Sequence, residues 1–203
     1  MKDTMKYAVI VLTLALCLAP AAKYAVAADE LVVADFNTGD KPNNLGGDFG
    51  TWDKDPNDET QGCKMSFEQD NALGNPDGYS IRLNYDVDSP NPAYNGFWMK
   101  LNNLDVAQYN TLNFSVKGDA TKGYTKRVKI ELKDNTGGAT PNASPYIVNG
   151  ITDQWQRISI PFEKFRKIKD WSKLTEFVVV FDDINSAPKA GSILIDHITF
   201  SKQ

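Results

Sequence analysis

YSIRLNY, residues 79–85, alternates apolar and polar side chains at every step. Successive side chains of a β-strand point to opposite faces of the sheet, so this alternation predicts a strand with one face in the core and the other in solvent. The same pattern recurs in TLNFSVK (111–117), RVKIELK (127–133) and QRISI (156–160). A clean alternation of this kind is typical of antiparallel sheets.

Two later stretches, EFVVVF (176–181) and GSILID (191–196), are almost continuously apolar. Such runs are expected where both faces of a strand are covered. LVVADF (31–36) reads as a first strand and 64–68 as a weaker one, and segments rich in Pro, Gly, Asn and Asp separate the strands. No segment has a long helical period. We therefore predict an all-β chain that forms a single domain over residues 29–203, a β-sandwich jelly roll of two antiparallel sheets.

The first residues read as a secretory signal peptide: a basic start, an apolar run and an A-x-A cleavage pattern at 25–27. Cleavage is expected after Ala27, with Ala21 and Ala28 as alternatives, so residues 1–27 are assigned to the signal peptide. The apolar run falls short of the ~20 residues that a spanning helix needs, and an uncleaved anchor is the alternative. The mature protein is expected to be exported, either periplasmic or secreted, with no membrane span after processing.

Removing residues 1–27 takes away three lysines and one aspartate, so the formal net charge changes from −4 to −6. Nucleic-acid binding depends on clustered Lys and Arg, and nucleic acid is therefore not an expected partner. Only Cys63 remains after processing, which excludes an internal disulfide. A buried, small apolar role is expected for Cys63, with intermolecular pairing or reactivity as the alternative.

The strand at 156–160 ends at Pro161, because proline cannot donate to a β-ladder. Phe162 and Phe165 follow three residues apart. We expect them to form a short turn that folds back and plugs the end of the core.

The order of these motifs resembles a known family. The motifs are, in order, GYSIRLNYD, AYNGFWMKL, YNTLNFSVKGD, RVKIELKD, WQRISIPFEKFRKIKDW, EFVVVFDD and GSILIDHITF, and they span nearly all of residues 31–201. This order is similar to that of the carbohydrate-binding modules of family 11 and of the complex I intermediate-associated protein 30 (CIA30-like) domains, both in the galactose-binding-like superfamily. The resemblance implies non-catalytic binding of a polysaccharide or oligosaccharide in a cleft on a concave sheet, often with a structural calcium ion.

A pyranose has apolar CH faces and a rim of hydroxyls, so aromatic platforms and polar side chains complement it. The aromatic candidates of the mature chain are Trp52, Tyr94, Trp98, Tyr124, Tyr146, Trp155 and Trp171. Matching the family's motifs position by position implies these ligand-binding residues: Trp52, Tyr94, Arg166, Asp170 and Trp171. Phe49 is the alternative to Trp52 in the glycine-rich loop.

The sequence departs from the family's pattern at three cleft positions. Val178 and Val180 stand where the family has polar residues, and Ile168 stands where it has an arginine. These departures favour a shorter or different ligand.

The resemblance also implies a calcium site. Asp35 and Asp196 match positions where related sandwiches place acids on the neighbouring first and last strands, and Asn37 adds an amide oxygen. Carboxylate and amide oxygens are the ligands that Ca²⁺ prefers. The alternative is two strand-end acids that lie in solvent or accept hydrogen bonds from turns.

Catalysis has little support in the sequence. The only histidine, His197, is expected at the surface or at an edge, and no G-x-S-x-G motif accompanies it. Adjacent residues of a strand point to opposite faces, so Asp196 cannot pair with it directly. We predict a glycan-binding protein that is not an enzyme. The alternative is a CIA30-like interaction or assembly factor, whose aromatic loops dock a protein partner.

Overall fold

The computed structural model describes residues 30–203, which fold into eleven β-strands. In chain order these are β1 (Glu30–Ala34), β2 (Phe49–Asp53), β3 (Gly62–Glu68), β4 (Ser80–Asp86), β5 (Tyr94–Leu104), β6 (Thr111–Gly118), β7 (Arg127–Asp134), β8 (Asn142–Asn149), β9 (Gln156–Pro161), β10 (Leu174–Asp182) and β11 (Ala190–Ser201). The predicted signal peptide, residues 1–27, lies outside the described residues.

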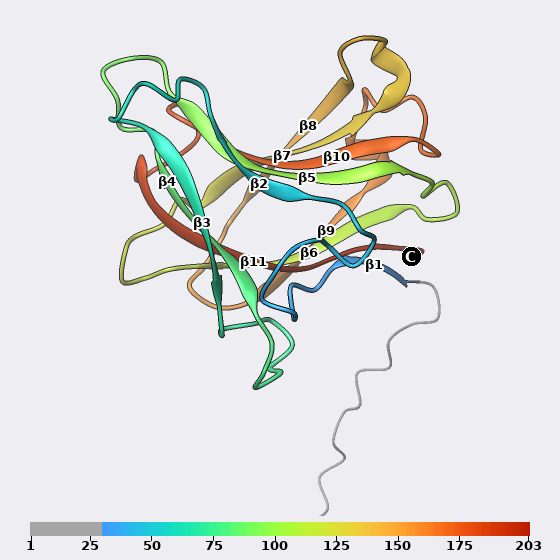
Figure 1. Cartoon of the computed structure of the whole chain (residues 1–203), viewed down its shortest axis with the longest axis horizontal. Helices are drawn as coiled ribbons and strands as arrows, with labels where there is room; N and C mark the ends of the chain where they lie inside the picture. Colours follow the sequence, from blue (N-terminus) through green and yellow to red (C-terminus); the bar gives the residue numbers. More distant parts are fainter. Residues whose placement is uncertain (1–29) are drawn as a thin grey trace, which may run out of the picture.

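The strands form two antiparallel sheets that pack face to face (Figure 1). One sheet has the order β3-β4-β11-β6-β9, with β1 also paired to β11. The other has the order β2-β5-β10-β7-β8. The prediction of an all-β sandwich of two antiparallel sheets is confirmed.

The core lies between the sheets and follows the alternation seen in the sequence. Ile81, Leu83 and Tyr85 of β4 are buried, whereas Arg82 and Asn84 are partly exposed on the other face. The two nearly continuous apolar runs became β10 and β11, each in the interior of its sheet. Burial of these apolar faces is the main stabilising contribution to the fold.

Two edge strands were not predicted from the sequence. β2 and β8 lie at opposite edges of one sheet, and each mixes polar and apolar residues without a clear alternation. β8 contains Pro145, which an edge strand tolerates because one side of its backbone needs no partner. Both strands are held by pairing with a longer neighbour, a tertiary effect that a local pattern does not show.

The described chain contains two short helical turns, η1 (Asn135–Gly137) and η2 (Phe162–Lys164). In residues 30–203 no helix has the length and apolar character needed to cross a bilayer. η2 follows directly after Pro161 and delivers Phe165 to the core, where it is 1% exposed. The predicted plug at the end of the core is confirmed.

The lone thiol of the described chain, Cys63, is buried on β3. Burial raises its pKa far above the ordinary range, and the nearby charge of Asp53 adds to the shift. Because the thiolate is the reactive form, the structure supports the expected small apolar role.

Asp134, the last residue of β7, ties the loop 165–173 to the sheet. Its fully buried carboxylate accepts hydrogen bonds from the backbone N–H groups of Thr136, Lys169 and Asp170, at 2.9, 2.6 and 3.2 Å. Burial alone would raise the pKa of Asp134, but these hydrogen bonds outweigh it and hold the pKa at about 2, against an ordinary value of 3.8.

Asp134→Asn is expected to lower the free energy of unfolding at pH 7 by about 2 kcal/mol, because the ionised carboxylate is the form that the loop binds. The folded pKa is lowered, so this stability is present above about pH 4 and is lost as the pH falls towards 2. Urea unfolding of both proteins from pH 7 to pH 2 should show two curves that converge in acid.

The exposed Asp153→Asn serves as the control and should follow the wild type throughout. A constant difference between Asp134→Asn and wild type over the whole pH range would contradict this account.

Candidate functional site

The solvent-facing side of the sheet β2-β5-β10-β7-β8 is concave (Figure 1), and a groove of about 700 Å³ lies on it. The raised ends of the concave face are formed by the loops beside β2 and β5 and by the β7–β8 hairpin. Residues of β2, β5, β10 and β7 line the groove, together with the loop that follows β10.

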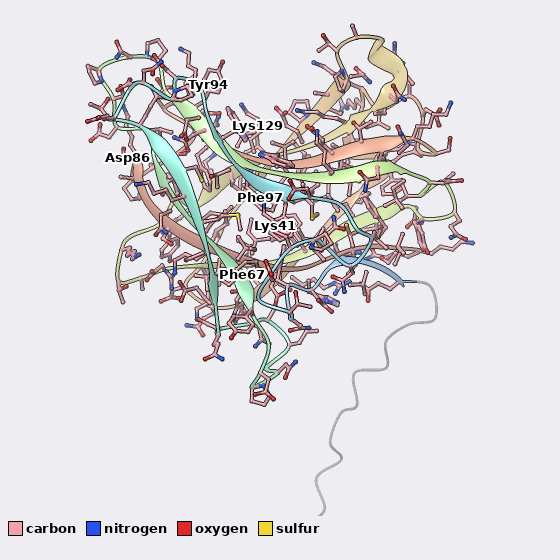
Figure 2. All side chains as sticks on the ribbon, in the orientation of Figure 1. Lys41, Phe67, Asp86, Tyr94, Phe97 and Lys129 are labelled. Atoms are coloured by element: carbon pink, nitrogen blue, oxygen red, sulfur yellow. The ribbon has the colours of Figure 1, made fainter. Side chains whose placement is uncertain are left out.

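The alternation of each strand decides which side chains reach the groove. Tyr94, Trp98 and Lys100 of β5 line it, whereas Phe97 between them is buried in the core. Lys129 reaches it from β7 in the same way. Figure 2 shows Tyr94 and Lys129 on the concave side and Phe97 beneath the sheet.

Three aromatic side chains stand in the groove. Trp52 and Tyr94 contact each other edge to face, with ring centroids 5.7 Å apart. Trp98 lies over the backbone of Gly50, its partner on β2, where an added Cβ would come within 3.2 Å of the indole. Glycine at position 50 therefore lets the indole lie close to the sheet.

Ion pairs cross the floor of the groove from strand to strand. Glu176 of β10 bridges Lys100 of β5 and Lys133 of β7, the latter at 2.8 Å, and Asp182 pairs with Lys129 at 2.9 Å. Burial would raise the pKa of both acids, but the hydrogen bonds from the lysines, and for Asp182 also those from Asn185, outweigh it and lower the pKa. The lysines are thus held in place beside the aromatic residues.

Val178 and Val180, the two departures from the family's polar cleft pattern, lie on this floor. Val178 is aligned between Trp98 and Glu131 in the sheet. The two valines are only 3% and 6% exposed. The surface of the groove that a ligand can reach is therefore supplied mainly by the aromatic and charged side chains beside them.

Two of the five residues predicted to bind the ligand, Trp52 and Tyr94, line the groove. Trp98 is among the aromatic candidates of the sequence but not among those five residues. The alternation of YNGFWMK, in which Tyr94, Trp98 and Lys100 share a face, is the signal that could have added it. The charged residues Lys129, Lys133 and Glu176 were missed, because only the pairing of strands brings them beside the aromatics.

The other three residues, Arg166, Asp170 and Trp171, lie outside the groove, in the loop before β10. Trp171 stacks on Phe162, with ring centroids 3.7 Å apart, and packs against the core. The Asp170 carboxylate accepts hydrogen bonds from Ser172, which lower its pKa.

This loop enters β10 at Leu174, whereas Tyr94 pairs with Asp182 at the far end of the same strand. Eight residues of strand place the loop about 27 Å from Tyr94, although Glu176, two residues into β10, already lines the opposite end of the groove. The predicted ligand role of Arg166, Asp170 and Trp171 stays a prediction, and the groove does not include them.

The predicted calcium ligands lie where β1 meets β11, and this pairing of the first and last strands is as expected. Asp196 is 2% exposed and accepts hydrogen bonds from the N–H groups of Ala72 and His197, at 2.8 and 2.6 Å. Burial raises the pKa of Asp196 to about 6, and the negative charge of Asp35 adds to the shift. The backbone N–H of Asn37 donates a hydrogen bond to the Asp35 carboxylate, at 3.2 Å.

These oxygens fit a hard cation in chemistry. Two close carboxylates repel each other, and none of the ion pairs found in residues 30–203 involves Asp196. A cluster of three or more His, Cys, Asp or Glu side chains is absent from the same residues, so amide and carbonyl oxygens would have to complete the coordination.

His197, expected at the surface or at an edge, is instead half-buried on the central strand β11. Its Nε2 lies 3.9 Å from Glu30, its Nδ1 has no partner in the described chain, and burial lowers its pKa. Its backbone φ is 47°, at a bulge between Asp196 and Thr199. His197 does not lie at an edge, because β11 is the central strand of its sheet, and the bulge keeps its side chain out of the core, which Ile195 and Ile198 enter instead.

The family model of carbohydrate binding domain 30 matches residues 43–202. The match covers almost the whole described chain. A comparison with curated proteins finds no match.

The fold is similar to that of solved carbohydrate-binding modules of Clostridium thermocellum. A family 11 module of a cellulosomal cellulase has 14% identity and a TM-score of 0.64, with 86% of this chain and 95% of that chain covered. The same comparison with a family 11 module in complex with a β-1,3-1,4-mixed-linked tetrasaccharide covers 86% and 96%, at the same identity and TM-score. A family 30 module of a cellulosomal cellulase has 16% identity and a TM-score of 0.59, with 86% and 98% covered. At these identities the likeness shows the fold.

Glu176→Gln should lower the free energy of unfolding at pH 7 by about 1 kcal/mol, since it leaves Lys100 and Lys133 without their shared counter-charge in a partly exposed site. The pKa of Glu176 is lowered, so its contribution is present above the ordinary value of 4.5 and is lost below it. Urea unfolding at low and high salt provides the measurement, and high salt should reduce the difference.

The control is Glu163→Gln, which removes an exposed pair with Lys164 and should change nothing measurable. Equal effects of the two substitutions would show that the bridge across the groove floor contributes no stability.

Proposed function

The chain belongs to the carbohydrate binding domain 30 family, and from this premise we propose that it is a non-catalytic domain that binds a glycan in the groove of the sheet β2-β5-β10-β7-β8. One observation carries the choice of this groove. Trp52, Tyr94 and Trp98 come from two strands and stand together on the one concave face, over a volume that suits an oligosaccharide.

The groove offers both kinds of contact that a sugar needs. Aromatic rings pack against the apolar CH faces of a pyranose, and Trp98 is held at a defined height over Gly50. Lysines and carboxylates can donate to and accept from the sugar hydroxyls. Because Glu176 and Asp182 already hold these lysines, little side-chain entropy is lost when the ligand arrives.

We take an oligosaccharide of the β-glucan type as the ligand. This choice is supported by the family and by the mixed-linked tetrasaccharide bound to a module of similar fold. Export of the mature domain fits a ligand of this kind, and it is supported by the signal-peptide pattern of residues 1–27.

We also propose that Asp35 and Asp196 hold a structural calcium ion, with the amide oxygen of Asn37 as a further ligand. The burial of the Asp196 carboxylate and its repulsion by the partly exposed Asp35 support this. A bound cation would offset their repulsion and fasten β1 to β11.

Trp98→Ala is expected to weaken binding of the mixed-linked tetrasaccharide by at least about 30-fold, because it removes the central aromatic platform. Calorimetric titration of the purified domain gives the affinity. Trp155→Phe is the matched control, since Trp155 precedes β9 in the opposite sheet and binds Asp70 at 2.8 Å outside the groove.

A glycan screen in which the wild type binds no sugar would overturn the proposal. One stoichiometric protein partner captured in the absence of any retention on polysaccharide would favour the CIA30-like alternative instead.

Calcium at millimolar concentration is expected to raise the thermal midpoint of the EGTA-treated protein by roughly 5–10 °C, the shift that ligand at about 100 times its Kd produces in a domain of this size. Asp196→Asn should abolish the increase. The exposed Asp88→Asn should retain it. An unchanged thermal midpoint for the wild type would contradict the proposed calcium site and leave the proposed glycan-binding groove untouched.

A further inference from the structure

Four large apolar side chains of the described residues are more than a third exposed: Leu45, Leu73, Tyr94 and Ile184. Ile184 is the extreme case, at 87%, in the loop between β10 and β11. Both Ile184 and Tyr94, which is 43% exposed, line one end of the groove. Single exposed apolar side chains are common, but two of them at the same end of a groove form an apolar patch of the kind that marks a ligand contact.

The loop that presents Ile184 is fixed in place by Asp182. One oxygen of this carboxylate accepts hydrogen bonds from the N–H groups of Ile184 and Asn185, at 3.2 and 2.7 Å, and from the Asn185 side chain at 2.8 Å. The other oxygen pairs with Lys129. Asp182 itself belongs to β10, so the loop is anchored to the interior of the sheet.

Asp183 makes a second attachment, to the strand that carries Tyr94. Its N–H donates to the carbonyl of Ala93, the residue before Tyr94, at 3.2 Å. Asp183 lines the groove, and its carboxylate takes no part in the hydrogen bonds that hold the loop. An aromatic ring, an aliphatic side chain and a carboxylate are therefore held at the same end of the groove.

We propose that Tyr94, Asp183 and Ile184 form an additional subsite for one sugar residue at this end of the groove. The proposal rests on the glycan-binding function proposed above. Tyr94 and Ile184 contact a CH face of the sugar, and the Asp183 carboxylate accepts a hydrogen bond from a hydroxyl.

The charge of the subsite selects an uncharged sugar. Asp182 is neutralised by Lys129, whereas Asp183 has no ion-pair partner in the described residues. A uronic acid placed here would meet a like charge, which costs binding free energy in a partly desolvated groove.

If the subsite exists, the affinity should depend on the number of sugar residues in the ligand. Calorimetric titration with mixed-linked β-1,3-1,4 oligosaccharides of three to six residues should show one step in length at which the wild type gains about fivefold in affinity. Ile184→Ala should lose most of this gain, and Asp183→Asn about half of it. Both variants should bind the shortest ligand that the wild type binds with unchanged affinity.

Leu73→Ala is the matched control, because Leu73 is 61% exposed and lies outside the groove. It should keep the full gain. Thermal unfolding of each variant should give the midpoint of the wild type, because Ile184 is exposed and its truncation removes no core contact.

Two results overturn the subsite. Either Ile184→Ala binds every length like the wild type, or it weakens all lengths equally, which would place Ile184 in the central contact. Failure of the wild type to bind any of these ligands would count against the proposed function itself. Trp98→Ala distinguishes the central contact from the subsite, since it should weaken the binding of ligands of every length.

Discussion

The pairing of β5 with β10 is the constraint on which the core and the groove both depend. In β10, Phe177, Val179 and Phe181 point into the core, and the residues between them point into the groove. A shift of the register by one residue would exchange these two sets. The ligand-facing surface is therefore as firmly fixed as the core, because one set of backbone hydrogen bonds positions both.

Close approach of backbones is what makes this pairing possible beside large aromatic side chains. Gly96 faces Trp52 on one side and Val180 on the other, and an added Cβ there would lie 1.9 Å from the carbonyl oxygen of Val179. A glycine at this position lets β5 pair closely with β10 while Trp52 and Trp98 occupy the space above. The strand gives up side-chain packing at this point and gains close pairing with β10.

The architecture and much of the core could be read from the sequence, because period-2 alternation in β4, β6 and β7 reports directly on a sheet with one buried face. The groove could be read only in part. Trp52 and Tyr94 were matched through motif order, but their neighbours Lys129 and Glu176 come from strands far apart in sequence and meet only through register. The bulge at His197 was also hidden, since alternation assumes that no residue is inserted.

The two ends of β10 show how similar residues take different roles. At its start, Trp171 stacks on Phe162 and Asp134 collects three N–H groups, so aromatic and acid serve to close the core. At its end, Asp182 again collects N–H groups, but the loop that it holds displays Ile184 to solvent. The sequence pairs Asp170-Trp171 and Asp183-Ile184 are alike, so an acid followed by a large apolar residue does not identify a ligand contact by itself. Exposure of the apolar side chain distinguishes the two cases, and it favours a ligand contact in the loop after β10 over one in the loop before it.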